Sequence, residues 1–255
     1  MEILIYALIG IITGILTGIT GSSGVVIVVP ALSFMGHTFQ QSVGTSLLVD
    51  VITTISVTYA YFRKGNVAIP LGLSLGTGAI IGAQIGSFIA LSIPEKPLEI
   101  FFAIFTLLMA YRAYRSRNRK AIPKEQSDNS KRSSLWYIFA AILSVLVGII
   151  TGTLGASGGI MFIAVMMILF KGMDVKKMVG TATLAMFLSA SSGAAAYAIS
   201  GVIDLEAAII IGSIALISGY FFGRKANELN PRIIYLFLSS VFVIVGISEF
   251  LRAIY

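Results

Sequence analysis

The feature that most constrains this chain is a glycine-rich segment that it contains twice. Residues 14–24 read GILTGITGSSG and residues 148–158 read GIITGTLGASG, with four glycines, a threonine and a serine in register 134 positions apart. Each copy interrupts a long apolar stretch. In lipid, an interrupted helix is tolerated only where it is buried in protein or lines a polar cavity. Two corresponding breaks in two halves of a chain indicate a ligand site at the interface between the halves.

The composition identifies the class of protein in which these breaks occur. Hydrophobic residues make up 57% of the 255 residues, charged residues make up 11%, and the mean hydropathy is +0.95. Soluble domains carry about 25% charged residues, so this chain is an integral membrane protein. The chain has no cysteine, which excludes disulfides and thiol catalysis. Its start, Met1-Glu2-Ile3, lacks the positive region of a signal peptide, so we expect the first apolar run to be retained.

The apolar stretches divide the chain into two related halves. They run at about 3–36, 42–62, 67–93, 97–114, 135–170, 178–199, 205–223 and 233–251, with breaks near 18–24 and 152–159. An unbroken stretch of about 20 residues is long enough to cross a bilayer. Outside the glycine segments, Val43-Gly44-Thr45 recurs as Val179-Gly180-Thr181. We therefore predict a first transmembrane repeat at 1–115, a basic linker at 116–134 and a second repeat at 135–255.

The distribution of positive charge predicts how the halves are oriented. The net charge is +7, and the loops at 63–64, 112–132, 171–177 and 224–232 contain sixteen of the eighteen lysines and arginines. Positively charged loops prefer the cytoplasm, so the charge indicates orientation in a cell membrane rather than nucleic-acid binding. The central linker is then cytoplasmic and both termini are external. Because a charged loop in one half corresponds to an uncharged loop in the other, the two repeats are predicted to be inverted.

An inverted repeat needs an odd number of crossings in each half. Three crossings come from the unbroken stretches, so the interrupted unit enters the membrane and returns on the same side. Its arms in the first half, about 3–17 and 25–36, measure roughly 22 and 18 Å as helices, which is short for a full crossing. The predicted fold is an all-α membrane protein with two inverted repeats, each made of a short broken hairpin and three transmembrane helices, about ten helices in all.

The two breaks are the first candidate for a binding site. Each is followed by the expected start of a helix, where free N–H groups and the helix dipole favour an anion, and where glycine lets the backbone turn sharply and a ligand approach. Close packing of small residues between helices is the competing interpretation. The candidate substrate-binding residues are Gly21, Ser22, Ser23 and Gly24 in the first half and Gly155, Ala156, Ser157 and Gly158 in the second.

Two further groups of polar residues are weaker candidates. Thr45 and Ser46, with Thr181 in the second half, lie near the starts of spans, where they supply either substrate-binding hydroxyls or ordinary helix caps. Gln84 lies inside the stretch 67–93 and is also assigned to the substrate site.

Asp50 is the only acid well inside a span, and a carboxylate at that depth usually marks function. It is a candidate for proton coupling, the alternative being a structural acid bonded to the hydroxyls of Thr53 or Thr54. Its counterpart in the second half is Met186, so the role is not duplicated.

Other kinds of chemistry have little support in the sequence. His37, the single histidine, falls in an expected outer loop and is interpreted as an interfacial residue. No cluster of metal ligands and no serine–histidine pair can be assembled, so no metal and no catalytic residue is predicted. A Walker-type loop is also missing from the sequence, so ATP-driven transport by this chain alone is not expected. No cofactor is predicted.

The chain resembles the TauE/SafE family of sulfite and sulfonate transporters over nearly its whole length. The resemblance is carried by the two glycine segments, by Val43-Gly44-Thr45-Ser46-Leu47, by Arg63-Lys64-Gly65-Asn66-Val67 and by Gly223-Arg224-Lys225. It implies a secondary transporter of small organosulfur or sulfur oxyanions. The chain departs from the family pattern where Ser22 and Ser23 replace glycines, where Ala164 replaces a proline, and in having Asp50.

The sequence thus favours a secondary transporter of sulfite, sulfonate or sulfoacetate-type anions that works by alternating access. A passive anion channel on the same scaffold is the alternative, and an enzyme is disfavoured. The predicted partners are a small organosulfur or sulfur oxyanion and membrane lipids, without nucleic acid. Assembly into a homo-oligomer is compatible with the sequence, which leaves substrate, direction and coupling ion open.

Overall fold

The computed structural model describes residues 2–116, 134–155, 158–170 and 173–226, together with residues 239, 240, 243, 244 and 247. Its regular structure is helical throughout these residues, which confirms the all-α prediction. The helices are α1 (Glu2–Thr20), α2 (Val25–Phe34), α3 (Phe39–Phe62), α4 (Ile69–Ser92), α5 (Glu95–Ser116), α6 (Ser134–Leu154), α7 (Gly159–Leu169), α8 (Val175–Ile199) and α9 (Leu205–Ala226).

Six of the described helices are long and apolar enough to cross a membrane: α1, α3, α4, α6, α8 and α9. The protein is therefore a multi-span membrane protein. Helices α2 and α7 are short, with 10 and 11 residues, and each follows one of the glycine breaks. The expected broken hairpins are thus α1–α2 and α6–α7. Most of the predicted last stretch, 233–251, and nearly all of the linker predicted at 116–134 lie outside the described residues.

The first arm of the α1–α2 hairpin is longer than the sequence suggested. Helix α1 continues to Thr20, three residues past the expected end at 17, and its 19 residues amount to about 28 Å. Gly18 does not break the helix, because its α conformation is kept by close packing on α9, where the Gly219 carbonyl and the Gly223 nitrogen lie against it. The chain leaves the helix only at Gly21, whose φ of 64° is left-handed.

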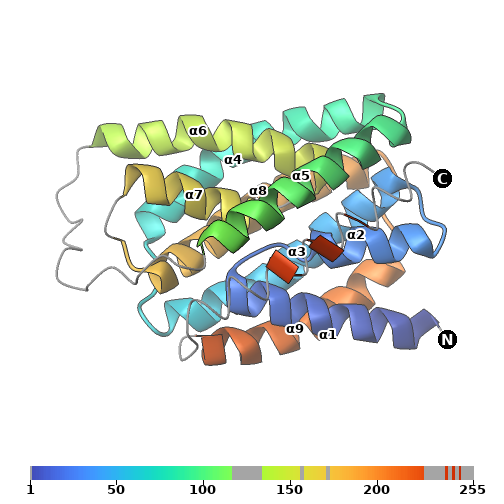
Figure 1. Ribbon diagram of the computed structural model, residues 1–255, viewed down its shortest axis with the longest axis horizontal. Helices are drawn as coiled ribbons and strands as arrows, with labels where there is room; N and C mark the ends of the chain where they lie inside the picture. Colours follow the sequence, from blue (N-terminus) through green and yellow to red (C-terminus); the bar gives the residue numbers. More distant parts are fainter. Residues whose placement is uncertain are drawn as a thin grey trace.

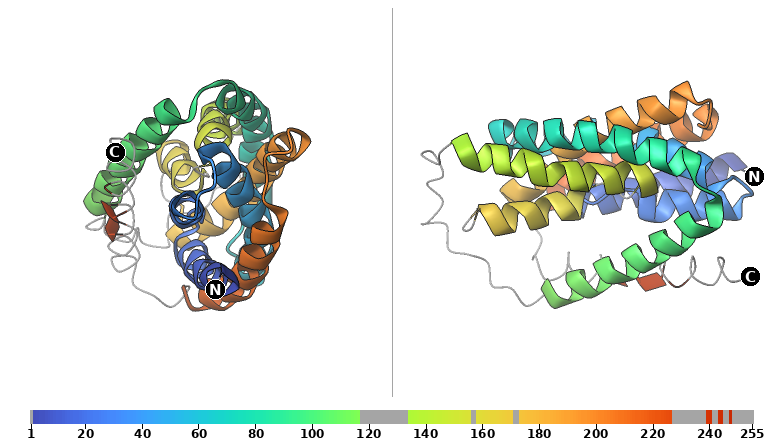
Figure 2. Two further views of the ribbon diagram at one scale, coloured as in Figure 1. Left: turned by 90° about the vertical axis from the view of Figure 1, so that its right-hand side faces the viewer. Right: turned by 90° about the horizontal axis from the view of Figure 1, so that it is seen from above.

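The two halves are interleaved rather than placed side by side. Helix α1 packs along α9, and its counterpart α6 packs along α4, so each hairpin lies against a helix of the other half. Helices α3 and α8 contact each other at the centre. Figures 1 and 2 show α1 and α6 running in opposite directions along the long axis of the molecule, the relation expected of inverted repeats. Helix α5 lies along one side of this bundle (Figure 2).

Lines of glycine allow these pairs of helices to approach closely. On α4, Gly78, Gly82 and Gly86 lie against the backbone of α6, so a methyl group at any of them would collide with a carbonyl oxygen. Gly10, Gly14 and Gly18 of α1 meet the backbone of α9 in the same way. Small residues at every fourth position are a common interface between helices in membranes, where backbone contact replaces the hydrophobic effect as the source of stability.

Two hydrogen bonds recur at corresponding positions of the two halves. The hydroxyl of Tyr61 donates to the carbonyl of Gly18 at 3.2 Å, and that of Tyr197 donates to the carbonyl of Gly152 at 2.9 Å. Each tyrosine is almost fully buried, and it joins α3 or α8 to the first arm of the hairpin of the same half. The breaks therefore have the same supporting framework in both copies.

Candidate functional site

The two glycine turns have the same backbone conformation and touch each other. Gly21 ends α1 with a φ of 64°, and Gly155 ends α6 with a φ of 63°. This left-handed conformation suits glycine because it carries no Cβ atom. A side chain on Gly159, at the start of α7, would collide with the carbonyl oxygen of Gly21. A Cβ atom on Gly155 would lie 2.9 Å from Cγ2 of Val25 at the start of α2. Segments 134 residues apart thus form one centre.

The side chain of Asp50, a residue of α3, lies at the start of α2. The hydroxyl of Ser23 donates to one carboxylate oxygen of Asp50, and the backbone N–H of Gly24 donates to the other at 3.0 Å. The N–H of Val25 in turn donates to the Ser23 hydroxyl at 2.9 Å. Asp50 is completely buried. The chain therefore places an acidic side chain where the N–H groups and dipole of α2 bind an anion best.

The start of α7 has no such acid among the described residues. The position that corresponds to Asp50 is Met186, which is fully buried, and its sulfur lies close to Gly159. Gly158, which precedes α7, has no side-chain cap. The predicted site residues Ala156 and Ser157 lie outside the described residues. One turn thus carries a built-in carboxylate, and the other has an apolar thioether in the same place.

Thr45 and Thr181 are engaged in matching hydrogen bonds within the protein. The hydroxyl of Thr45 accepts from the backbone N–H of Asp204 at 2.9 Å, just before α9. That of Thr181 accepts from the N–H of Ala68 at 2.9 Å, just before α4. Each hydroxyl holds the start of a long helix of the other half. These bonds support the capping interpretation, and a role of the two threonines in substrate binding stays a prediction.

Gln84 and Ser22 lie in different surroundings. The amide of Gln84 donates to the carbonyl oxygen of Ser192 at 2.7 Å and to its hydroxyl at 3.0 Å, and the side chain is exposed on the outside of α4. Ser22 is buried, and its backbone N–H donates to the hydroxyl of Thr20 at 3.0 Å. Ser22 is thus part of the first turn, whereas Gln84 bridges α4 and α8 away from it.

Several buried hydroxyls lack a hydrogen-bond partner in the described part of the chain. They belong to Thr13 and Thr17 of α1, Ser46 of α3, Ser87 of α4 and Ser189 of α8. A buried polar group without a partner costs about 1–3 kcal/mol, which a ligand or water molecule can recover. Ser46 was a predicted site residue; the other four were not. Thr13 lies against Gly24, and Thr17 lies one helical turn before Gly21. The sequence signal for Thr13 and Thr17 is a hydroxyl placed one or more helical turns before a helix break.

His37 forms an ion-pair contact that the sequence did not suggest. Its Nε2 lies 2.9 Å from Oδ2 of Asp204, and its Nδ1 lies 3.1 Å from the carbonyl oxygen of Leu32. The contact joins the loop after α2 to the loop before α9. Burial raises the pKa of Asp204, but hydrogen bonds from the Ala207 N–H and from His37 outweigh it, so that the pKa lies below its ordinary value. Within the described residues, no three potential ligands gather to hold a metal.

Comparison with known proteins places the chain in a family. The model of the sulfite exporter TauE/SafE family matches residues 6–248. The "Probable membrane transporter protein YunE" of Bacillus subtilis is 26% identical over 96% of both chains. YdhB of the same organism, with the same description, is 27% identical over 87% of this chain and 89% of its own. MJ0441 of Methanocaldococcus jannaschii, also described as a probable membrane transporter, is 23% identical over 94% and 92%.

No solved structure matches the chain. The family match covers far more than half of the sequence and includes both glycine turns, Asp50 and the helices around them. The chain therefore belongs to the sulfite exporter TauE/SafE family and is a membrane transporter.

Proposed function

We propose that this protein is a secondary transporter of small sulfur oxyanions, of the sulfite, sulfonate or sulfoacetate type. The observation that carries the proposal is the contact between the two glycine turns at the starts of α2 and α7. One of these starts already binds a carboxylate, that of Asp50, through a hydroxyl and a backbone N–H. A sulfonate or sulfite group needs the same hydrogen-bond donors, a hydroxyl and a backbone N–H. The start of α7, where Met186 stands in place of an acid, is the proposed binding position of this group.

Asp50 gives this site a route to proton coupling. An ionised Asp50 repels an anion bound 4–8 Å away by about 2–4 kcal/mol at an effective dielectric constant of 20. Protonation removes this penalty, so proton and anion promote each other's binding, which is the linkage that symport requires. The hydrogen bonds of Ser23 and Gly24 to Asp50 are the contacts that would rearrange when it gains a proton.

Alternating access would act on the interleaved halves. Each hairpin packs on a helix of the other half, so a relative movement of the two halves would act on both turns. Inverted repeats with short broken helices at their interface are a recurring design of secondary transporters. In the proposed orientation the protein lies in the cell membrane with the linker at 116–134 in the cytoplasm, as its basic residues favour.

Flux measurements in proteoliposomes test the proposal directly. With sulfite or sulfoacetate as the tracer, a transporter shows saturation and counterflow, whereas a passive channel shows neither. Thermal unfolding with sulfite, sulfoacetate, taurine and sulfate identifies the substrate, since a ligand that binds only the folded state raises the unfolding midpoint. If none of the four anions changes the midpoint or exchanges across the membrane, the substrate class is wrong.

Cysteine labelling tests the orientation in the same preparation. The chain has no cysteine, so single cysteines at positions 120 and 254 can be probed with an impermeant thiol reagent. We expect the linker cysteine to react from the cytoplasmic side and the terminal one from the outside. Labelling of both from one side would contradict the orientation.

A further inference from the structure

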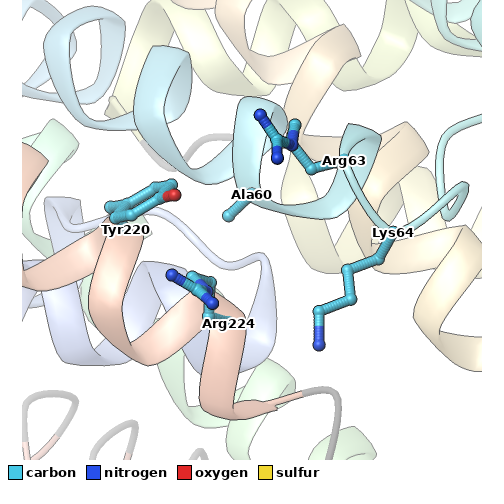
Figure 3. A pocket seen from close by; sticks show the side chains of 5 residues that line it. All are labelled: Ala60, Arg63, Lys64, Tyr220 and Arg224. Atoms are coloured by element: carbon cyan, nitrogen blue, oxygen red, sulfur yellow. The ribbon is translucent and has the colours of Figure 1, made fainter.

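A second candidate site lies at the end of the bundle where α3 and α9 both end. A cavity of about 160 Å³ is lined by Ala60, Arg63, Lys64, Tyr220 and Arg224. Figure 3 shows Tyr220 and Arg224 of α9 facing Ala60 and the cations Arg63 and Lys64 across it. None of the described residues that line the cavity is acidic. The cavity thus holds three positive charges without a matching carboxylate from its own walls.

The two arginines are held in place by a pair of tyrosines. The guanidinium of Arg63 donates to the hydroxyl of Tyr59 at 3.2 Å and lies 5.9 Å from the centre of its ring. The guanidinium of Arg224 lies 5.8 Å from the ring centre of Tyr220. The two rings stack on each other with their centres 6.2 Å apart. Stacking on aromatic rings orders a guanidinium while leaving most of its N–H donors available for an oxyanion.

Exposed apolar side chains lead along both helices towards this cavity. Ile55, Tyr59 and Phe62 share one face of α3, and Ile217 and Phe221 share one face of α9; each is 49–63% exposed. In a membrane protein, such faces contact lipid chains. The cations therefore lie where an apolar, lipid-facing surface ends, which is the depth of phospholipid headgroups.

The repeat shows that the fold does not require these charges. The positions that correspond to Arg63 and Arg224 in the other half are Ile199 and Phe88, which are 89% and 74% exposed. The stacked tyrosines correspond to Ala195 and Gln84. The corresponding helix ends of the other half thus carry apolar side chains in place of the two arginines.

We propose that this cavity binds the phosphate of an anionic phospholipid, with the acyl chains lying along the exposed faces of α3 and α9. A phosphodiester offers oxygens to two guanidiniums and one ammonium, the pairing that arginine favours. Basic pockets between membrane helices on the cytoplasmic side are suited to such headgroups. The site is separate from the glycine turns, and its occupant is a lipid of the inner leaflet.

Lipid retention by the purified protein tests this inference without any transport assay. The protein is mixed in detergent with phosphatidylglycerol and phosphatidylcholine in equal amounts, and bound lipid is measured by native mass spectrometry. We expect at least a tenfold preference for phosphatidylglycerol. The double variant R63Q/R224Q should lose that preference, and the single variants should each reduce it. Equal retention of the two lipids, or an unchanged preference in the double variant, would overturn the proposal.

A control of equal charge separates the cavity from general electrostatics. The double variant K96Q/K225Q also removes two charges, but Lys225 does not line the cavity and Lys96 lies at the start of α5. It should keep the tenfold preference; a loss as large as that of R63Q/R224Q would refute a specific site.

Inorganic phosphate at 10 mM should not displace phosphatidylglycerol. If it does so, and alone raises the unfolding midpoint, the cavity binds a soluble oxyanion and the lipid assignment is wrong. Because both arginines are at the surface, size-exclusion chromatography should show both double variants folded.

Discussion

The starts of α2 and α7 share the same backbone conformation but differ in the residue that faces them. Each follows a left-handed glycine, and each is supported by a buried tyrosine that donates to the hairpin. At α2 the facing residue of α3 is Asp50, whose carboxylate accepts from Ser23 and Gly24. At α7 the facing residue of α8 is Met186. The two copies thus share one backbone geometry and differ in a single facing side chain.

This difference suggests a division of roles between the copies. A helix start that carries its own carboxylate can respond to protons, whereas one without a carboxylate can receive a substrate anion. Two symmetric starts would bind two anions close together, with repulsion of about 2–4 kcal/mol at 4–8 Å. In the proposed function, an internal carboxylate at one of them would confine the substrate to the other.

The largest effect is expected from making the two starts alike. Met186→Asp places a carboxylate at α7, where it would repel the substrate and compete for its donors. A penalty of about 2 kcal/mol corresponds to a loss of roughly 30-fold in apparent affinity, so flux at low substrate should fall at least that far. The measurement is initial uptake into proteoliposomes against substrate concentration.

Two variants at the same position separate charge from packing. Met186→Leu keeps volume and should transport nearly normally, and Met186→Asn adds polarity without charge and should lose less than Met186→Asp. If all three variants behave alike, the loss comes from disturbed packing around Gly159 and the comparison between the two starts does not explain it.

The second prediction removes the charge from the first start. Asp50→Asn should abolish the dependence of flux on a pH gradient, while counterflow, which needs no net proton movement, should persist. Asparagine can still accept from Gly24, so the free energy of unfolding should fall by no more than the loss of one hydrogen bond, about 1 kcal/mol. A well-folded Asp50→Asn protein with unchanged pH-gradient dependence would show that Asp50 has a structural role only.

The third prediction tests whether the left-handed glycines of the two turns contribute equally to stability. Gly21→Ala and Gly155→Ala should each destabilise the protein by about 1–2 kcal/mol from the left-handed conformation, and more from contact. A Cβ on Gly21 would lie 2.7 Å from Cγ1 of Val179, and one on Gly155 would lie 2.9 Å from Val25. Thermal unfolding in detergent measures both changes.

Gly65 is the matched control for this pair. It has a φ of 71° but no heavy atom within 4 Å of an added Cβ, so Gly65→Ala should show the conformational strain alone. Transport should survive in Gly65→Ala and be reduced in the two turn variants. Equal losses of stability and transport in all three would mean that the contacts around Gly21 and Gly155 contribute nothing.

The smallest effect is expected at His37 and Asp204, whose contact joins the two halves. It is not repeated at the corresponding positions, which are Met173 and Ala68. The pKa of Asp204 is lowered in the folded protein, so its contribution is present above the ordinary value near 3.8 and is lost as pH falls through the lowered pKa. Asp204→Asn should lower stability at neutral pH by under about 1 kcal/mol, as for other partly exposed pairs.

A pH series of unfolding midpoints checks this sign. The difference between the natural protein and Asp204→Asn should be constant above about pH 5 and should shrink as the solution becomes more acidic. A difference that grew on acidification would mean that the carboxylate is not stabilised in its charged form.

The sequence alone determined the class, the repeat and the position of the breaks. Apolar stretches of fixed length follow from the thickness of the bilayer, and the breaks follow from glycines that recur in register, so both can be read without contacts. The family followed from the same motifs and is confirmed by the match over residues 6–248. The end of α1 was predicted too early, because the packing that keeps Gly18 helical involves α9, about 200 residues away.

Only the tertiary structure decided what the polar residues near the breaks do. Asp50 could be recognised in the sequence as an unusual buried acid, but its pairing with Ser23 and Gly24 depends on how α2 folds back against α3. Thr45 and Thr181 carry hydroxyls that suit a ligand or a helix cap equally well. The interleaving of the halves brings them to the N–H groups of Asp204 and Ala68, and their role in substrate binding stays a prediction. Hydrogen bonds between residues far apart in the chain are set by the packing of whole helices, which local sequence patterns do not specify.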